Sequence, residues 1–198
     1  MTSKLIVNSI RHTGASADAI TMDASGNVTF PGNATCSGTP SGFGGITMAD
    51  QWRLTTTFQV SSQAFITSNW ERVDTNGYGK IGTGMSESSG EFSFPSTGIY
   101  LVRIVINWYA VGGGTNYNRI SIQTTTNNSS YNPAANSHSG VESADQYNNM
   151  SAEIMFDVTD VSTHKVKFES FASNTRPRVL GDTDHNRSYV TFIRLGDT

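Results

Sequence analysis

Residues 98 to 109 read GIYLVRIVINWY and give the strongest strand signal in the chain. Successive side chains of a β-strand point to opposite faces, so a period of two separates this run into two sets. One face carries Tyr100, Val102, Ile104, Ile106 and Trp108, and the other carries Leu101, Arg103, Val105, Asn107 and Tyr109. The pattern predicts a long central strand over 98–110, buried on at least one side.

Two later runs alternate in the same way. HKVKFESFAS (164–173) sets Val166, Phe168 and Ser170 against charged residues, and SYVTFIRL (188–195) does the same around Phe192. No amphipathic helical period accompanies them, so the predicted fold class is all-β, a two-sheet jelly-roll sandwich. We expect strands near 51–60, 65–73, 90–94, 98–110, 117–126, 150–158, 163–173 and 187–195.

Composition narrows the function classes. The chain has 198 residues, enough for one core and an extension, and its net charge of −3 with scattered cations argues against a nucleic-acid partner. The single cysteine, Cys36, excludes an internal disulfide framework. No stretch approaches the ~20 apolar residues of a membrane span, and no export signal precedes the strands, so we expect a chain made in the host cytoplasm and not inserted in a membrane.

The organisation changes near residue 47. Before it, AITMDASGNVTFPG (19–32) predicts a β-hairpin about a turn at 23–26, and GNATCSGTPSGFGG (32–45) predicts a flexible linker. We therefore divide the chain into an attachment segment with its linker, 1–46, and a sandwich domain, 47–198. A lone hairpin is marginal in water, so residues 1–31 are expected to pair with other copies or with a larger surface; the alternative is a disordered tail.

The sequence contains no complete cofactor-binding, catalytic or metal-binding motif. GYGKIG (77–82) has the glycine spacing of a dinucleotide site, but the following TGMSESSGEFSF (83–94) predicts no helix to receive a phosphate, so we expect no cofactor. None of the four histidines lies in a catalytic or metal-binding motif, so we expect no enzyme and no catalytic residue.

GDTDHN (181–186) imitates the start of a calcium loop through Asp182 and Asp184. Arg187 stands where that loop needs glycine, and Ile193 stands where it needs a bidentate glutamate. A polar turn is the better interpretation, with an irregular calcium site as the alternative.

Two segments suggest recognition. NWYAVGGGTNYNR (107–119) and TNNSSYNPAANSHSG (126–140) place Tyr109, Tyr117, Asn118 and Tyr131 among small polar residues in predicted loops. Aromatic area with adaptable hydrogen bonding suits a partner such as a cell-surface saccharide. The alternative is that the tyrosines pack at strand ends or against a neighbouring subunit.

The segment GEFSFPSTGIYLVRIVIN (90–107), with RSYVTFIRL (187–195) near the end, resembles C1q/TNF-like jelly rolls over residues 47–198. The resemblance implies a homotrimer, because members of that class are usually homotrimers. It also implies structural roles for the positions that match the pattern, which are Phe92, Phe94, Pro95, Gly98, Tyr100 and Phe192.

The wording of ITMADQWRL (46–54), together with AITMDASGNVTFPG, resembles small bacteriophage virion proteins. This implies a viral structural protein, either a tail fibre, head fibre or spike or a capsid decoration protein, anchored to other virion proteins of the capsid or tail through residues 1–31. A receptor-binding tip that recognises host glycan and a free-standing C1q-like lectin are the alternatives.

A threefold assembly also has a physical argument. The central strand carries apolar residues on both faces, and neighbouring subunits would bury the second face. The alternative is that Leu101 and Val105 are covered within one chain by an N-terminal strand.

Overall fold

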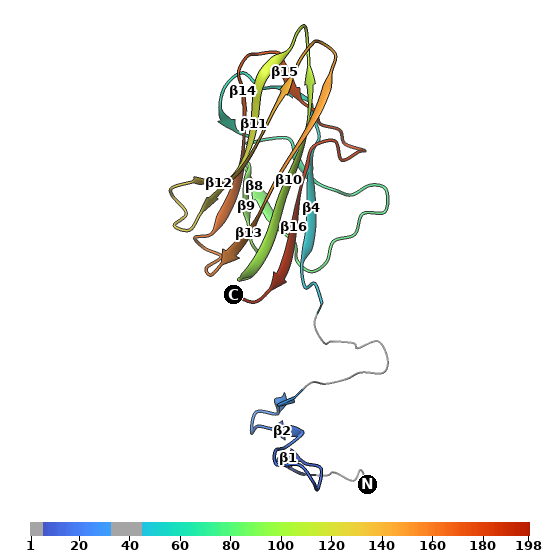
Figure 1. Cartoon of the computed structure of the whole chain (residues 1–198), viewed down its shortest axis with the longest axis vertical. Helices are drawn as coiled ribbons and strands as arrows, with labels where there is room; N and C mark the ends of the chain where they lie inside the picture. The colour runs from blue at the N-terminus through green and yellow to red at the C-terminus, as the bar shows by residue number, and fades with distance from the viewer. Residues whose placement is uncertain (1–5, 33–44) are drawn as a thin grey trace. The chain divides into compact units, whose positions relative to one another are not determined.

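The computed structural model describes residues 6–32 and 45–198, and its regular elements there are all β-strands. The chain divides into two compact units, Met1–Gly45 and Ile46–Thr198 (Figure 1). The all-β prediction is therefore confirmed. Within the described part of the chain, no helix is long and apolar enough to cross a membrane.

The first unit holds a small antiparallel sheet. Its strands are β1 (Ser9–Ile10), β2 (Ile20–Met22) and β3 (Val28–Thr29), in the order β1-β2-β3. The hairpin predicted about residues 23–26 is the β2–β3 pair, and the Asp23 carboxylate closes its turn by accepting hydrogen bonds from the backbone N–H groups of Ser25 and Asn27 at 2.9 Å each. Most of the predicted linker, together with Cys36, lies outside the described residues.

The second unit is a sandwich of two sheets. One sheet has the order β5-β15-β10-β16-β4-β7 with β13 also paired to β10, and the other has the order β12-β11-β14-β9-β8 with β6 paired to β14. The strands are β4 (Ala49–Leu54), β5 (Phe58–Gln59), β6 (Ala64–Phe65), β7 (Trp70–Arg72), β8 (Ser86–Ser88), β9 (Glu91–Ser93), β10 (Gly98–Ala110), β11 (Thr115–Thr125), β12 (Asn132–Val141), β13 (Tyr147–Val158), β14 (Lys165–Ala172), β15 (Pro177–Val179) and β16 (Tyr189–Gly196).

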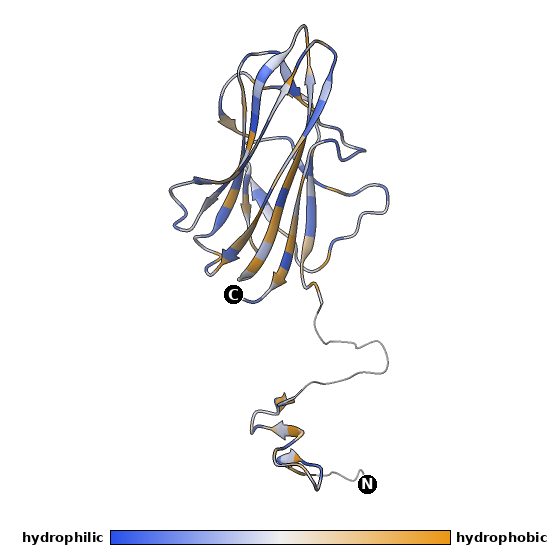
Figure 2. Ribbon diagram, viewed as in Figure 1, coloured by the Kyte–Doolittle hydropathy of each residue, from blue (hydrophilic) through white to orange (hydrophobic). Residues whose placement is uncertain are grey.

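The central strand β10 spans the predicted residues 98–110. One edge pairs with β13 along its length, and the other pairs with β16 and then β15. Its inward side chains fill the core, and all are fully buried: Tyr100, Val102, Ile104, Ile106 and Trp108. The alternation of hydrophobic and polar segments along β10 is visible in Figure 2.

An aromatic cluster joins the two sheets. The ring of Phe92 on β9 lies 5.6 Å from Trp52 and 5.4 Å from Trp70 on one side of the sandwich core, and 5.5 Å from Phe168 and 5.2 Å from Phe192. Edge-on and tilted pairs of this kind stabilise a core beyond their buried area. Phe94 is also buried and packs 4.7 Å from Tyr100, whereas Pro95 is exposed.

Gly98 begins β10 with a backbone φ of 139°, a conformation that side chains rarely adopt. A Cβ at this position would stand 2.5 Å from the carbonyl oxygen of Gly196, so the close approach of β10 and β16 also requires glycine.

Several predicted strands differ from the observed ones. The run predicted at 51–60 is broken between β4 and β5, and the run at 65–73 contains β6 and β7 separated by a bend, with Asn69 at a φ of 67°. Strands β8, β12 and β15 were not predicted. β12 is an edge strand with only Val141 buried, so it lacks the apolar alternation that identifies a strand, and β15 is short and begins at a proline.

Candidate functional site

The outward face of the central sheet carries an apolar strip. Leu101 on β10 pairs with Met155 on β13 and with Ile193 on β16, so the three side chains share this face. Met155 is 75% exposed, and Leu195 further along β16 is 52% exposed. In the next row Arg103 is exposed opposite Glu153, which adds charge beside the strip.

Of the two outward residues that the sequence argument singled out, Val105 is buried within the chain and Leu101 is half-buried. The apolar strip therefore extends from the half-covered Leu101 to the exposed Met155. Exposed, contiguous apolar side chains of this kind mark surfaces for protein contact. We call Leu101, Met155, Ile193 and Leu195 the apolar strip.

Tyr131 belongs to a cluster on the outer side of the second sheet. Its hydroxyl donates a 2.6 Å hydrogen bond to Glu91, and its ring packs 5.9 Å from Phe65. The Lys167 ammonium lies 4.4 Å from the ring centre of Tyr131 and 3.2 Å from the Glu91 carboxylate. Burial and the bond to Glu91 raise the pKa of Tyr131, and the same hydrogen bond and Lys167 hold the pKa of Glu91 low. Tyr131 is thus fixed in place, with its hydroxyl already occupied.

Tyr117 lies on β11 at the far end of the same sheet. Its ring packs 5.1 Å from His138 and 5.4 Å from Phe171, and it remains 39% exposed. Arg119 lies over the Phe171 ring and donates a 2.6 Å hydrogen bond to Glu169.

Tyr109 lies on β10, where it stacks 4.8 Å from Tyr147 and donates a hydrogen bond to Asp145. That bond raises the pKa of the Tyr109 hydroxyl. The two recognition segments are therefore not wholly loops, because Tyr109, Tyr117 and Asn118 lie in the strands predicted over 98–110 and 117–126. Alternation along β11 turns Asn118 into the interior, where it is fully buried and accepts a 3.1 Å bond from the Thr115 hydroxyl, so it is not a surface recognition residue.

Asp182 and Asp184 lie in the turn before β16. The Asp182 carboxylate accepts hydrogen bonds from the backbone N–H groups of Asp184 and His185, at 2.8 and 3.1 Å, and lies 3.2 Å from Arg187. Those backbone bonds lower the pKa of Asp182. Among the residues that the structure describes, no group of three or more His, Cys, Asp or Glu side chains is placed to hold a metal ion.

A buried carboxylate, which sequence reasoning missed, ties β4 to the loop at 73–85. Asp50 is 2% exposed and is bound by both nitrogens of the Arg72 fork, the Tyr78 hydroxyl at 2.7 Å and the Met85 N–H at 2.8 Å. Burial acts to raise the pKa of Asp50, but the hydrogen bonds outweigh it and hold that pKa below its usual range. Burial also raises the pKa of Tyr78 to about 12. We assign this arrangement a structural role, because Arg72, Tyr78 and the Met85 N–H all bind the Asp50 carboxylate.

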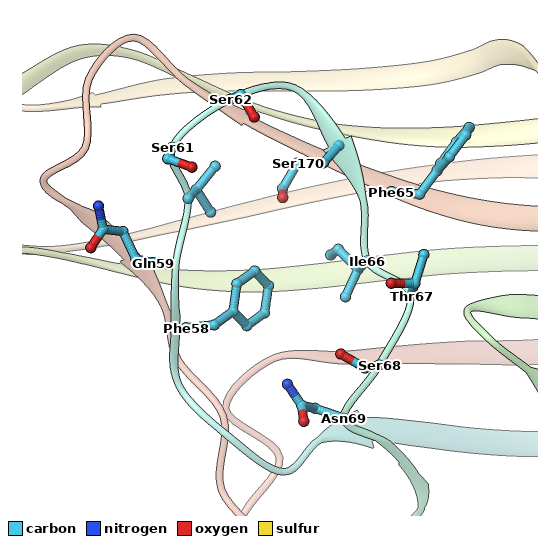
Figure 3. A pocket seen from close by; sticks show the side chains of 12 residues that line it. Phe58, Gln59, Ser61, Ser62, Phe65, Ile66, Thr67, Ser68, Asn69 and Ser170 are labelled. Carbon is cyan, nitrogen blue, oxygen red and sulfur yellow. The ribbon is translucent and has the colours of Figure 1, made fainter.

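Sequence reasoning also missed a pocket of about 230 Å³ between the two sheets (Figure 3). It lies where the chain crosses from β5, paired with β15, to β6, paired with β14, and back to β7. Its lining comes from residues 58–69 without Gln63, and from Ser170 on β14. All of these residues except Ser170 belong to one short segment, which carries no recognised motif, and the sequence does not show that this segment encloses a cavity against β14.

No protein-family model and no curated protein matches the sequence. Solved structures do match. Eiger TNF from S. frugiperda aligns with a TM-score of 0.58 and 14% identity over 77% of this chain and 95% of its own. The domain has the TNF-like jelly-roll fold. Murine APRIL at pH 8.5 aligns with a TM-score of 0.54 and 12% identity, covering 75% of this chain and 98% of its own.

The TNF-like fold confirms the jelly-roll prediction for the second unit. The PRD1 vertex protein P5 aligns over 77% of this chain and 100% of its own at 14% identity, with a TM-score of 0.44 that is too low to establish a common fold. At these identities the TNF-like matches establish the fold alone.

Proposed function

We propose that the chain is a homotrimeric structural protein of a bacteriophage particle, a fibre, spike or capsid decoration protein that is anchored by its N-terminal unit and displays the jelly roll. Its function is binding through buried area, and no residue is assigned a catalytic role. The observation that carries the assembly is the apolar strip on the central sheet, of which one chain leaves Met155 and Leu195 exposed and covers Leu101 and Ile193 only in part. A threefold arrangement of a TNF-like sandwich would bury this face against neighbours.

The N-terminal unit supports the anchoring role. Within residues 6–32 no side chain is buried, although three short strands form there. A sheet without a core gains little free energy from folding, so it needs a partner surface. Together with the likeness of AITMDASGNVTFPG to virion proteins, this favours attachment of the segment to a capsid or tail protein.

The mass of the protein in solution tests the assembly. Light scattering on a sizing column is expected to give a molar mass of three chains, both for the full-length protein and for residues 46–198. Met155→Glu places a charge in the apolar strip and is expected to shift the mass toward one chain. Val161→Glu is the matched control, because Val161 is 37% exposed in a turn outside the strip. A single-chain mass for the unaltered protein would contradict the trimer.

Purified phage particles test whether the protein is located on the virion. Mass spectrometry of purified phage particles produced with this gene is expected to detect the chain, and an antibody against residues 46–198 is expected to label their surface. Deletion of residues 1–45 is expected to remove both signals while leaving the trimer intact. Particles that lack the chain would exclude the virion role and leave a free-standing trimer.

A further inference from the structure

The pocket beside β5 is preformed. The Val60 N–H donates to the carbonyl of Pro177 at 3.2 Å, and the Ile66 N–H donates to the carbonyl of Phe168 at 2.8 Å, so each wall is anchored to a different sheet. The indole N–H of Trp70 adds a 2.9 Å bond to the Ile66 carbonyl. A ligand would therefore lose little free energy to ordering these walls.

The pocket contains a polar group without a partner. Ser170 is only 4% exposed and lines the cavity from β14, and its hydroxyl lies on the side of Phe58 and Ile66 (Figure 3). No hydrogen bond joins this hydroxyl to another of the described residues. Because this hydroxyl faces the cavity, a ligand that can donate to it or accept from it would take the place of solvent there.

The lining determines which ligand chemistry fits. None of the lining residues is charged, so neither an anion nor a cation finds a counter-charge. Apolar side chains form one part of the wall, with Phe58 presenting an aromatic ring, and hydroxyl and amide groups form the rest. The apolar members are Phe58, Val60, Ala64, Phe65 and Ile66, and the polar members are Gln59, Ser61, Ser62, Thr67, Ser68, Asn69 and Ser170.

A sugar ring combines these same properties, since it has an apolar C–H face and hydroxyl groups at its edge. The pocket is smaller than the ~300–1,000 Å³ of sites for drug-sized ligands, so it suits a single ring. We propose that it binds one neutral sugar ring of a surface glycan, with the apolar face of the ring on Phe58 and hydroxyl groups bonded to Ser170 and Asn69. The site adjoins the Tyr131 cluster through Phe65 and gives the displayed domain a ligand.

The test uses the full-length protein and the methyl glycosides of glucose, galactose, mannose and N-acetylglucosamine, observed by saturation-transfer NMR. At least one is expected to bind with a dissociation constant in the millimolar range, as a single ring makes few contacts. Ser170→Ala is expected to weaken that binding about three- to tenfold through loss of one hydrogen bond. Ala64→Trp, at an exposed lining position, is expected to abolish binding by filling the pocket.

Ser129→Ala is the control, because Ser129 is an exposed serine in the loop before β12, outside the pocket and the apolar strip, and it is expected to leave binding unchanged. Thermal unfolding of each variant identifies any loss of folding. If no glycoside binds the folded protein, or if one binds equally well to the wild type and to Ala64→Trp, the sugar site is wrong. Either result is distinct from failure of the proposed function, which the oligomeric mass and the particle measurements decide.

Discussion

The strands of the two units differ in length and in how far their side chains are buried. In residues 6–32 the strands have two or three residues each, and every side chain is at least partly exposed. In residues 46–198 the inward side chains of β10 are all fully buried, and an aromatic cluster joins both sheets. Turn hydrogen bonds are the main local contacts of the first unit, whereas buried apolar area stabilises the second.

This difference fits the division of roles that we propose. A unit without a core gains little free energy from folding, which suits a segment that becomes ordered at an attachment site. A unit with a full core keeps its shape without a partner and can present the same surfaces wherever the chain is attached.

The largest expected effect is in the aromatic cluster. Phe92→Ala removes a fully buried ring that packs on both sheets, and it is expected to lower the free energy of unfolding by about 3–5 kcal/mol. Urea unfolding followed by tryptophan fluorescence measures the change. Phe30→Ala is the control from the other unit, where Phe30 is 43% exposed, and it is expected to change stability by less than ~0.5 kcal/mol. Equal losses in the two variants would remove the contrast between the units.

A smaller loss is expected at the buried carboxylate. Asp50→Asn removes the charge that the Arg72 fork and the Met85 N–H bind, and it is expected to cost about 3 kcal/mol. Asp23→Asn makes the same change in the exposed turn of the first unit and is expected to leave unfolding of residues 46–198 unchanged. The unfolding temperatures of the two variants distinguish a buried hydrogen-bonded carboxylate from a local turn contact.

The pH dependence sharpens the same point. The pKa of Asp50 is lowered by folding, so its contribution to stability is complete above the unfolded pKa of ~3.9 and is lost as the pH falls through the folded pKa. The difference in unfolding free energy between wild type and Asp50→Asn is therefore expected to shrink as the pH falls below about 4. A difference that stays constant over this window would show that the charge of Asp50 does not stabilise the fold. The comparison cancels the exposed carboxylates with lowered pKa, such as Asp18 and Asp160, which both proteins share.

The smallest effect is expected from truncation. Deleting residues 1–45 is expected to change the unfolding free energy of the remaining domain by less than ~0.5 kcal/mol, because the core cluster is built from residues 48–192. A peptide of residues 6–32 alone is expected to show no stable sheet by circular dichroism. A stable isolated peptide would show that the first unit does not need a partner.

Strands with an apolar alternating face were predictable, and strands that are very short or carry no such face were not. Burial of one face requires apolar residues at every second position of β10 and β14, and this alternation is visible in the sequence. β12 is recognisable only from its pairing with β11, because its exposed Asn, Ser and Ala side chains reflect no core. Asn118 lies in the predicted strand over 117–126, on the same face as the buried Ile120 and Ile122, but its polar side chain was assigned to surface recognition instead of the interior.

The sequence by itself determined the all-β class, the central strand with its inward face, the change of organisation near residue 47 and the hairpin about Asp23. These features depend on neighbours a few residues apart, through alternation and turn chemistry. Only the tertiary structure decided the apolar strip, the hydrogen bonds around the buried Asp50 carboxylate and the pocket lined by Phe58 and Ser170. Each of these joins side chains from strands far apart in the chain, and local patterns do not record which distant strands come together.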